Sequence, residues 1–159
     1  MTLCFEGAGA LLSFLVFVQD HPPVEAIGIS IFHSIAAFNN SGFDILGGLQ
    51  NLIPYQNNLL LNLTTAGLII FGGLGFLVIL DILKKRSFRA LALHSKVVIA
   101  MSAVLILLGT LLLKATENVT WLGAFFQSVS ARTAGFSTYP IGSFTDAGLF
   151  VLILLMFVG

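Results

Sequence analysis

Charged residues are scarce in this chain. Asp, Glu, Lys and Arg make up 9% of its 159 residues, whereas 57% are hydrophobic and the mean hydropathy is +1.03. A soluble globular domain carries about 25% charged residues. Because so few charges cannot cover a water-soluble body of this length, the composition excludes that class and predicts an integral membrane protein.

Cysteine is almost absent as well. Cys4 is the only one, which excludes an internal disulfide and a cysteine-based metal site. The first residues lack a basic stretch and a small-residue cleavage site, so we predict no signal peptide. The sequence also lacks HExxH and GxSxG motifs and any paired His/Cys cluster. We therefore predict no catalytic residues, no resident metal and no bound cofactor, and keep an intramembrane enzyme only as an alternative.

Apolar runs make up most of the sequence. Four of them predict membrane spans, at residues 3–18, 59–83, 95–113 and 147–159. A span needs about 20 apolar residues, and two further runs, at residues 26–38 and 121–131, are too short for one. We therefore predict an all-α membrane protein in which the two short runs are re-entrant helices. The run at 147–159 is also short, which predicts a truncated span and a chain that is a piece of a longer protein.

The basic residues are concentrated in one place. Five of the seven lie in a single short stretch: Lys84, Lys85, Arg86, Arg89 and Lys96. Basic clusters beside membrane spans mark the cytoplasmic side, so we predict a cytoplasmic loop over residues 84–94, with the basic cluster reaching residue 96. Nucleic-acid binding is the other interpretation of a basic run. One short loop between two apolar segments does not fit it, and we predict no nucleic-acid partner.

Two short segments repeat one pattern. Residues 32–43 read FHSIAAFNNSGF and residues 126–136 read FQSVSARTAGF, so each passes through polar residues to a small residue, Gly and Phe. Each sits on a short apolar run and precedes a span. If both runs dip into the membrane and return, the two copies enter from the outside in the same orientation. The predicted architecture is therefore span, re-entrant helix, loop and span, repeated at residues 1–83 and 95–159.

The loops that follow the two re-entrant helices have the chemistry of an ion path. A helix C-terminus carries partial negative charge, and the carbonyl oxygens of a non-helical segment can replace the water shell of an ion. Glycine allows the positive φ that aims carbonyls inward. We expect the two phenylalanines to pack outward and brace the loops. The loops at 39–43 and 132–136 supply these candidate ion-binding residues: Asn39, Asn40, Ser41, Gly42, Phe43, Thr133, Ala134, Gly135 and Phe136. Small-residue helix packing is the alternative interpretation.

Other polar residues in apolar segments are predicted to support the loops. Arg132 is costly at membrane depth, and we expect it to anchor the second loop through carbonyls or an acidic residue, with repulsion of the ion as the alternative. His33 and Gln127 occupy matching positions in the two short helices, which predicts that they pack and form hydrogen bonds behind the two loops. Glu6 has three interpretations of equal weight: a proton or ion site, an interfacial residue, or a contact to a missing repeat.

These segments resemble the filter loops of a known family. Residues 32–44 and 127–138 look like the second and third filter loops of the Trk/Ktr/HKT potassium transporters, and most resemble those of the Ktr-type membrane subunit. Residues 69–76 and 93–96 are similar to the stretch that links those repeats. The resemblance covers nearly the whole chain.

The resemblance implies a pore of four repeats, of which Gly42 and Gly135 would be two of the four filter glycines. It implies inward transport of potassium, or in some members sodium, across the plasma membrane. The implied partners are the missing first and fourth repeats, a second copy in a homodimer, and a cytoplasmic ring of nucleotide-binding subunits. The alternatives are a solute transporter with discontinuous helices, and an inert fragment or scaffold.

Overall fold

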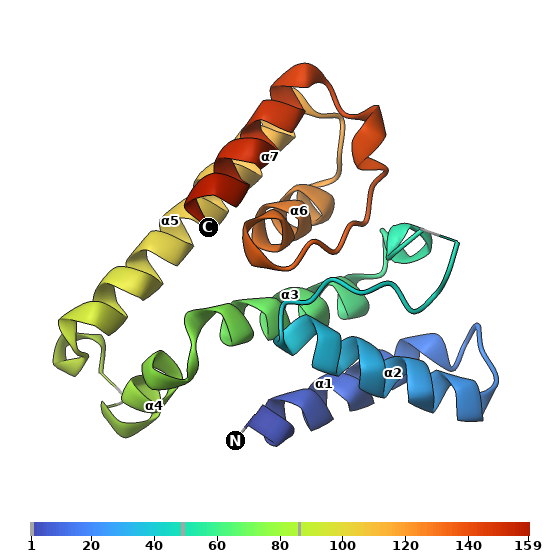
Figure 1. Ribbon diagram of the computed structural model, residues 1–159, viewed down its shortest axis with the longest axis horizontal. Coiled ribbons are helices and arrows are strands. Elements are labelled where there is room, and N and C mark those ends of the chain that lie inside the picture. The colour runs from blue at the N-terminus through green and yellow to red at the C-terminus, as the bar shows by residue number, and fades with distance from the viewer. Residues whose placement is uncertain (1, 49, 86) are drawn as a thin grey trace.

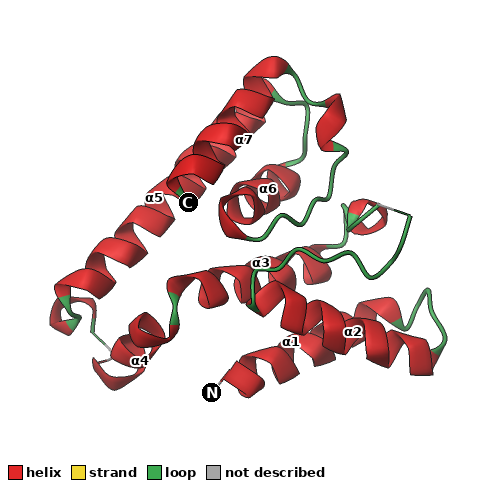
Figure 2. Cartoon of the chain, viewed as in Figure 1, coloured by secondary structure: helices red, strands yellow, loops and turns green. Residues whose placement is uncertain are grey.

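The regular secondary structure in the part of the chain that the structure describes is helical. The computed structural model describes residues 2–48, 50–85 and 87–159, and within them it contains seven α-helices and no strand. Figure 2 shows these helices joined by loops, of which the longest lies between α2 and α3. The helices are α1 (Thr2–Phe17), α2 (Pro23–Phe38), α3 (Leu59–Leu74), α4 (Phe76–Lys85), α5 (Leu93–Thr116), α6 (Trp121–Thr133) and α7 (Asp146–Val158). Short 3-10 turns lie at Ile53–Tyr55, Phe88–Ala90 and Ile141–Ser143. The all-α prediction is confirmed.

The helices form two groups of three. Helices α1, α2 and α3 all contact one another, and we call them the first bundle; α5, α6 and α7 do the same and form the second bundle. Helix α3 also packs against α6, which joins the two bundles, and α4 connects them along the chain (Figure 1). Helices α2 and α6 correspond to the two predicted re-entrant helices, and we call them the pore helices. Each packs against the two other helices of its own bundle.

One close contact organises the first bundle. Gly9 of α1 faces the Ser34 hydroxyl of α2 and the side chain of Leu68 of α3, at a distance that leaves no room for a Cβ. The Ser34 hydroxyl donates to the carbonyl of Glu6 at 2.6 Å. Small residues let helix backbones approach closely, and a serine hydroxyl that bonds a neighbouring carbonyl adds to such a contact within a membrane.

The same contact recurs in the second bundle. Gly109 of α5 faces the Ser128 hydroxyl of α6 and the side chain of Leu155 of α7. The Ser128 hydroxyl donates to the carbonyl of Ile106 at 2.9 Å, three residues before the glycine, as in the first bundle. The two bundles therefore repeat one packing arrangement in the same chain order.

The predicted span at residues 59–83 is not one continuous helix. It breaks at Gly75, whose φ of +81° lies outside the helical range, and α3 and α4 meet there at 95°. A positive φ is easy only for glycine, and three glycines between residues 72 and 75 already weaken the helix. Helix α4 carries Lys84 and Lys85 of the basic cluster, and Lys85 pairs with Asp81 at 2.8 Å. Arg86 lies outside the described residues.

Only part of the chain meets the length of a membrane span. Helix α5, with 24 residues, is long and apolar enough to cross a membrane, and α3 with α4 makes a second such segment if the bent pair is counted as one. Helices α1, α2 and α7 are apolar but shorter. They begin and end within a few residues of the predicted runs at 3–18, 26–38 and 147–159. Which helices cross remains a prediction.

The loop before α3 is fixed by one buried asparagine. Asn62 is 2% exposed, and its amide donates to the carbonyls of Tyr55 at 2.9 Å and Asn58 at 2.7 Å. Asn58 in turn caps α3, because its side chain accepts from the N–H of Leu61. The Tyr55 ring packs edge-on against Phe17, 5.3 Å between ring centroids. This loop is therefore tied to the end of α1.

Tyr55 is expected to make the first bundle sensitive to alkaline pH. Burial, and then the neighbouring Asp20 carboxylate, raise the pKa of its phenol from 10.0 to about 12. Because the folded state holds this proton more tightly, its stabilising effect is full below pH 10 and is lost as the pH rises through 12. An absorbance titration of phenolate should show a component with a midpoint near 12 that Tyr55→Phe removes and Asp20→Asn moves downward. An unchanged titration in Tyr55→Phe would contradict this assignment.

Candidate functional site

The two glycine loops lie against each other. Gly42 and Gly135 both have positive φ, at +66° and +85°, as the sequence predicted for residues that aim carbonyls. A Cβ on Gly42 would collide with the carbonyl oxygen of Ala134, so the two loop backbones are in direct contact. Segments that are about 90 residues apart in the chain therefore form one site, between the C-terminal ends of α2 and α6.

Each pore helix ends in the same way. The N–H of Ser41 donates to the carbonyl of Ala36 at 3.0 Å, and the N–H of Gly135 donates to the carbonyl of Ser130 at 3.0 Å. Each bond spans five residues, so each helix closes with a wide final turn and the chain then leaves the helix axis. The Asn39 amide donates back to the helix, to the carbonyl of Ile35 at 2.9 Å.

The loop carbonyls have no internal donors. Among the described residues, no N–H or hydroxyl donates to the carbonyl oxygens of Thr133, the last residue of α6, or of five loop residues: Asn40, Ser41, Gly42, Ala134 and Gly135. Carbonyl oxygens without a protein donor are free to bind water or a cation, and backbone oxygens bind monovalent cations well. The next carbonyl, that of Phe136, accepts from the Ser130 hydroxyl at 2.6 Å.

Asn40 ties the first loop to α3. Its φ is +52°, a conformation that asparagine tolerates better than most residues. With its amide oriented to satisfy the hydrogen bonds around it, Asn40 donates to the carbonyls of Ala37 and Ile69 at 3.1 and 3.2 Å and accepts from the N–H of Gly73 at 3.2 Å. The Asn40 side chain therefore braces the loop, and only its backbone is left to face an ion.

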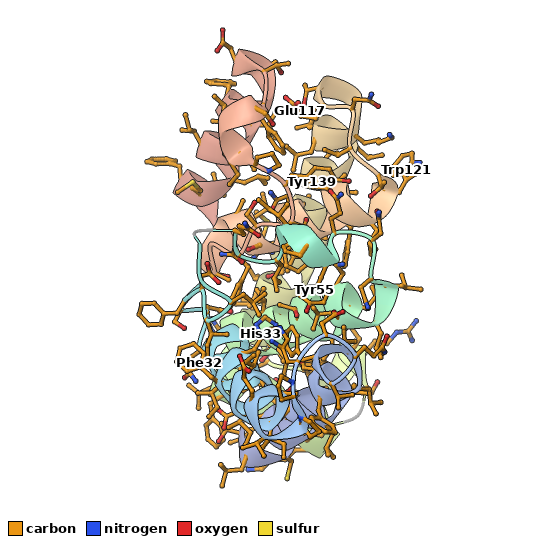
Figure 3. The ribbon with its side chains drawn as sticks, turned by 90° about the vertical axis from the view of Figure 1, so that its right-hand side faces the viewer. Phe32, His33, Tyr55, Glu117, Trp121 and Tyr139 are labelled. Carbon is orange, nitrogen blue, oxygen red and sulfur yellow. The ribbon has the colours of Figure 1, made fainter. Side chains whose placement is uncertain are left out.

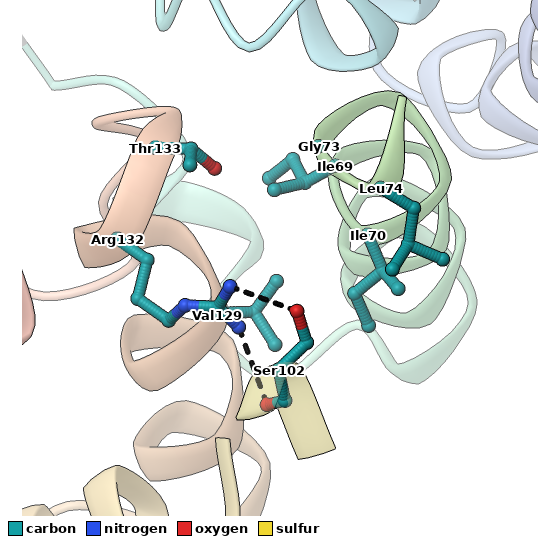
Figure 4. Close-up of a pocket in the computed structure, with 8 residues that line it drawn as sticks. All are labelled: Ile69, Ile70, Gly73, Leu74, Ser102, Val129, Arg132 and Thr133. Carbon is teal, nitrogen blue, oxygen red and sulfur yellow. Dashed lines mark hydrogen bonds between the residues drawn. The ribbon is translucent and has the colours of Figure 1, made fainter. Parts of the chain in front are cut away.

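Two residues of the predicted second loop belong to the helix. The loop predicted at 132–136 begins at Ala134, because Arg132 and Thr133 form the last turn of α6. Figure 4 shows both beside a small cavity of about 20 Å³ between α3, α5 and α6, lined by Gly73, Ser102 and others. A cavity of this size holds one water molecule. The second loop is therefore shorter than the sequence predicted.

Arg132 joins α6 to α5. Its guanidinium donates to the carbonyl of Ser102 at 3.3 Å and to the Ser102 hydroxyl at 3.2 Å (Figure 4). Its Nε is buried without a partner in the described part of the chain. The prediction placed carbonyls or an acidic residue opposite Arg132. The structure has a carbonyl there, that of Ser102 on α5, together with the Ser102 hydroxyl. The anchoring of the second loop itself remains a prediction.

Ser102→Ala distinguishes the two interpretations of Arg132. If Arg132 anchors the second loop, Ser102→Ala and Arg132→Met should both reduce transport. The loss of one charged hydrogen bond in Ser102→Ala should also lower stability by about 1.5 to 3 kcal/mol. If Arg132 acts by repelling the ion, Arg132→Met should change transport and Ser102→Ala should leave it unaltered. We expect the first result, measured as melting temperature and rubidium influx. Ser13→Ala, at a buried serine of α1 whose hydroxyl has no partner among the described residues, is the control.

The two loop phenylalanines have different surroundings. Phe136 is 2% exposed, and its ring stands edge-on to His33, 5.2 Å between centroids. His33 is buried inside the first bundle, as Figure 3 shows, and its Nε2 bonds the Thr65 hydroxyl at 2.8 Å. Phe43, by contrast, is 65% exposed. Phe136 therefore packs against the other bundle, whereas Phe43 lies on the surface, and the bracing role predicted for both remains a prediction.

His33 and Gln127 have different partners although they occupy matching positions. The Gln127 amide donates to the Ser137 hydroxyl at 3.0 Å, and that hydroxyl bonds the carbonyl of Tyr139. Gln127 thus holds the segment after its own loop, whereas His33 contacts the other bundle's phenylalanine. Sequence reasoning missed Ser102, Thr65 and Ser130, and the available signal was a lone hydroxyl in an apolar segment.

Comparison with known proteins identifies the family of this chain. A sequence model of TrkH, described as a cation transport protein, matches residues 8–159. The chain belongs to the TrkH family. Membership in a family of cation transport proteins places it in a membrane and outside the enzyme families. The Trk/Ktr resemblance of the sequence is confirmed.

The curated relatives are transporters with longer chains. The Ktr system potassium uptake protein B of Vibrio alginolyticus is 40% identical over 144 residues, which cover 82% of this chain and 31% of that protein. The potassium/sodium uptake protein NtpJ of Enterococcus hirae is 35% identical, covering 95% and 36%. A Ktr system potassium uptake protein B of Bacillus subtilis is 32% identical, covering 99% and 38%. The chain therefore spans about a third of the length of the relatives that it matches.

Proposed function

We propose that this TrkH-family chain supplies two adjacent filter loops to a pathway for potassium uptake. The observation that carries the proposal is the set of loop carbonyls without donors at the contact between Gly42 and Ala134. Oxygens so placed can replace the hydration shell of a monovalent cation, and the ends of α2 and α6 add partial negative charge. Relatives named as potassium uptake proteins support the choice of ion, and NtpJ supports sodium as a second ion.

The same proposal extends to the partners, the location and the orientation of the transporter. The helix–loop–helix arrangement of each bundle corresponds to one pore repeat, and the first and fourth repeats would be partners of this chain. We place the transporter in the plasma membrane, with the basic loop 84–96 on the cytoplasmic side. A homodimer and a nucleotide-binding ring on that side are partners proposed from the resemblance.

A solute transporter with discontinuous helices is the competing function. The break between α3 and α4 is of the kind such proteins use. Many of them are built from inverted repeats, however, whereas the two short apolar runs here are expected to enter the membrane from the same side. That shared orientation favours a pore of direct repeats.

Growth on low potassium tests the proposal. A bacterium that lacks potassium uptake should be rescued by the full-length reading frame that carries this segment, and Gly135→Asp should abolish rescue. Gly135 has open space around it, so the new carboxylate causes no collision, although its φ of +85° strains any side chain there. Gly47→Asp places the same carboxylate at another open glycine with a φ of +78°, and as the matched control it should still rescue. Full rescue by Gly135→Asp would refute the filter assignment.

A further inference from the structure

The basic loop lies beside an open groove. This groove has a volume of about 470 Å³, far more than the single-water cavity beside Arg132, and it lies between the end of α4 and the start of α5. Its lining is apolar except for one serine: Ile82, Leu83, Ser87, Phe88, Leu91 and Ile99. Leu83 and Phe88 are 52% and 57% exposed, so large apolar side chains border the opening. The groove therefore offers an apolar surface to a ligand that carries a hydrocarbon chain.

The groove is separate from the two glycine loops. The main contacts of α4 are with α3, with α5 and with the 3-10 turn at Phe88–Ala90. Figure 1 shows α4 and the start of α5 together at one end of the molecule, away from α6. A ligand in this groove would therefore not touch the proposed ion path.

The positive charge around the groove is not balanced by carboxylates. The segment from α4 through the first half of α5 contains five basic residues and one carboxylate, that of Asp81. Asp81 is already engaged, because its two oxygens bind the Lys85 ammonium and the Ala92 N–H, each at 2.8 Å. Among the described residues, no carboxylate pairs with Arg89 or Lys96. These two cations are therefore available to an anionic ligand.

Lys96 lies at the edge of the groove. It stands one turn before Ile99 on α5, and its ammonium donates to the carbonyl of Arg89 at 2.8 Å, in the turn that also contains Phe88. A lysine ammonium has three protons to donate, and in the described part of the chain that carbonyl takes one of them. The other two, and the guanidinium of the exposed Arg89, can donate to phosphate oxygens. The groove thus combines an apolar lining with cationic donors at its edge.

We propose that this groove binds an anionic phospholipid, with the phosphate at Arg89 and Lys96 and one acyl chain against Phe88 and Ile99. The cytoplasmic side proposed for the basic loop supports this ligand, because anionic lipids give that leaflet its negative potential and basic pockets between membrane helices bind their headgroups. A free phosphate would leave the apolar lining without a partner, and a neutral lipid would bring as much positive charge as negative. The site does not depend on which ion is transported.

Native mass spectrometry of the full-length transporter tests the headgroup site. The purified protein is titrated with phosphatidylglycerol, and with phosphatidylcholine as the neutral lipid. Lys96→Gln and Arg89→Gln should each weaken the tightest phosphatidylglycerol binding about fivefold, the contribution of one basic residue near an anionic membrane, whereas Lys96→Arg should bind like the wild type. Lys114→Gln is the matched control and should leave binding unchanged. Lys114 also donates to a loop carbonyl, that of Val119 at 2.6 Å, but at the other end of α5.

Photo-crosslinking at Phe88 identifies the occupant of the groove. The photoreactive analogue p-benzoylphenylalanine replaces Phe88 in the full-length transporter, which is placed in vesicles with equal amounts of phosphatidylglycerol and phosphatidylcholine. We expect adducts with phosphatidylglycerol in excess over phosphatidylcholine. Ser87→Trp, which fills the groove from its exposed edge, should remove them, and Lys96→Gln should remove the excess. Inorganic phosphate should not compete, because it cannot occupy the apolar lining.

Each other outcome overturns the proposal. Equal binding of the two lipids, or phosphatidylglycerol binding that neither charge-removing variant weakens, would show that the cations recognise no headgroup. Displacement of the lipid by inorganic phosphate would make this a site for the free anion. Protein adducts at position 88, from the ring subunits, a second copy or the rest of the polypeptide, would make a protein the occupant. Rubidium influx reports on the proposed function separately, so lipid binding without influx would refute that function and keep this site.

Discussion

Gly42→Ala is expected to abolish potassium uptake in the full-length transporter while the protein still reaches the membrane. The added methyl group would meet the carbonyl oxygen of Ala134 in the other loop, and neither backbone can move without shifting a pore helix. The residue would also hold φ at +66°, which costs a non-glycine residue about 1 to 2 kcal/mol. If this strain destabilises the conducting conformation, uptake drops by about tenfold for each 1.4 kcal/mol. The collision with the Ala134 oxygen lowers uptake further.

Gly47→Ala is the matched control for this substitution. Gly47 has a φ of +78°, so alanine there suffers the same backbone strain, but no atom lies within 4 Å of the position of its Cβ. We expect Gly47→Ala to transport at near wild-type rates, measured as initial rubidium influx at equal protein in the membrane. If both variants lose transport equally, backbone strain and not the contact between loops is what matters at Gly42.

Gly72→Ala is expected to destabilise the first bundle more than any other single methyl addition on α3. A Cβ at Gly72 would collide with the carbonyl oxygen of Phe38, the last residue of α2, and would lie 2.8 Å from its carbonyl carbon. Both obstacles are backbone atoms, so no side chain can rotate away. Adding atoms to a tightly packed contact costs about 1 to 3 kcal/mol, and this geometry predicts the upper end of that range or beyond.

Gly67→Ala, in the same helix, provides the comparison. Gly67 has open space around it, and alanine favours a helix over glycine by about 1 kcal/mol. We therefore expect Gly67→Ala to leave the melting temperature of the detergent-purified transporter unchanged or raised, and Gly72→Ala to lower it clearly. Similar melting temperatures for the two variants would show that α2 and α3 are less closely packed at Phe38 than described.

Some features of the site could be predicted from sequence because they are local. The need for positive φ at Gly42 and Gly135 follows from glycine in a short polar loop after an apolar helix, and both have it. The helical segments follow from apolar runs of sufficient length. The equivalence of the two halves follows from one motif repeated in one order.

Other features depend on tertiary contacts that no single segment encodes. Glycines at 72, 73 and 75 could each break α3, and packing of Gly72 on Phe38 keeps that part helical and leaves the break to Gly75. Phe43 and Phe136 stand in the same motif, yet Phe136 is buried against His33 of the other bundle and Phe43 is exposed. The Ser102 partner of Arg132 lies on another helix, 30 residues away.

The position of the transported ion tests the central claim most directly. Crystals or frozen grids of the full-length transporter prepared in rubidium or thallium would show the ion by its strong scattering. We predict ion density in contact with loop carbonyls from both bundles, those of Ser41 or Gly42 and those of Thr133 to Gly135. Density confined to the break between α3 and α4, or to the Arg132 cavity with none at the loops, would contradict the account.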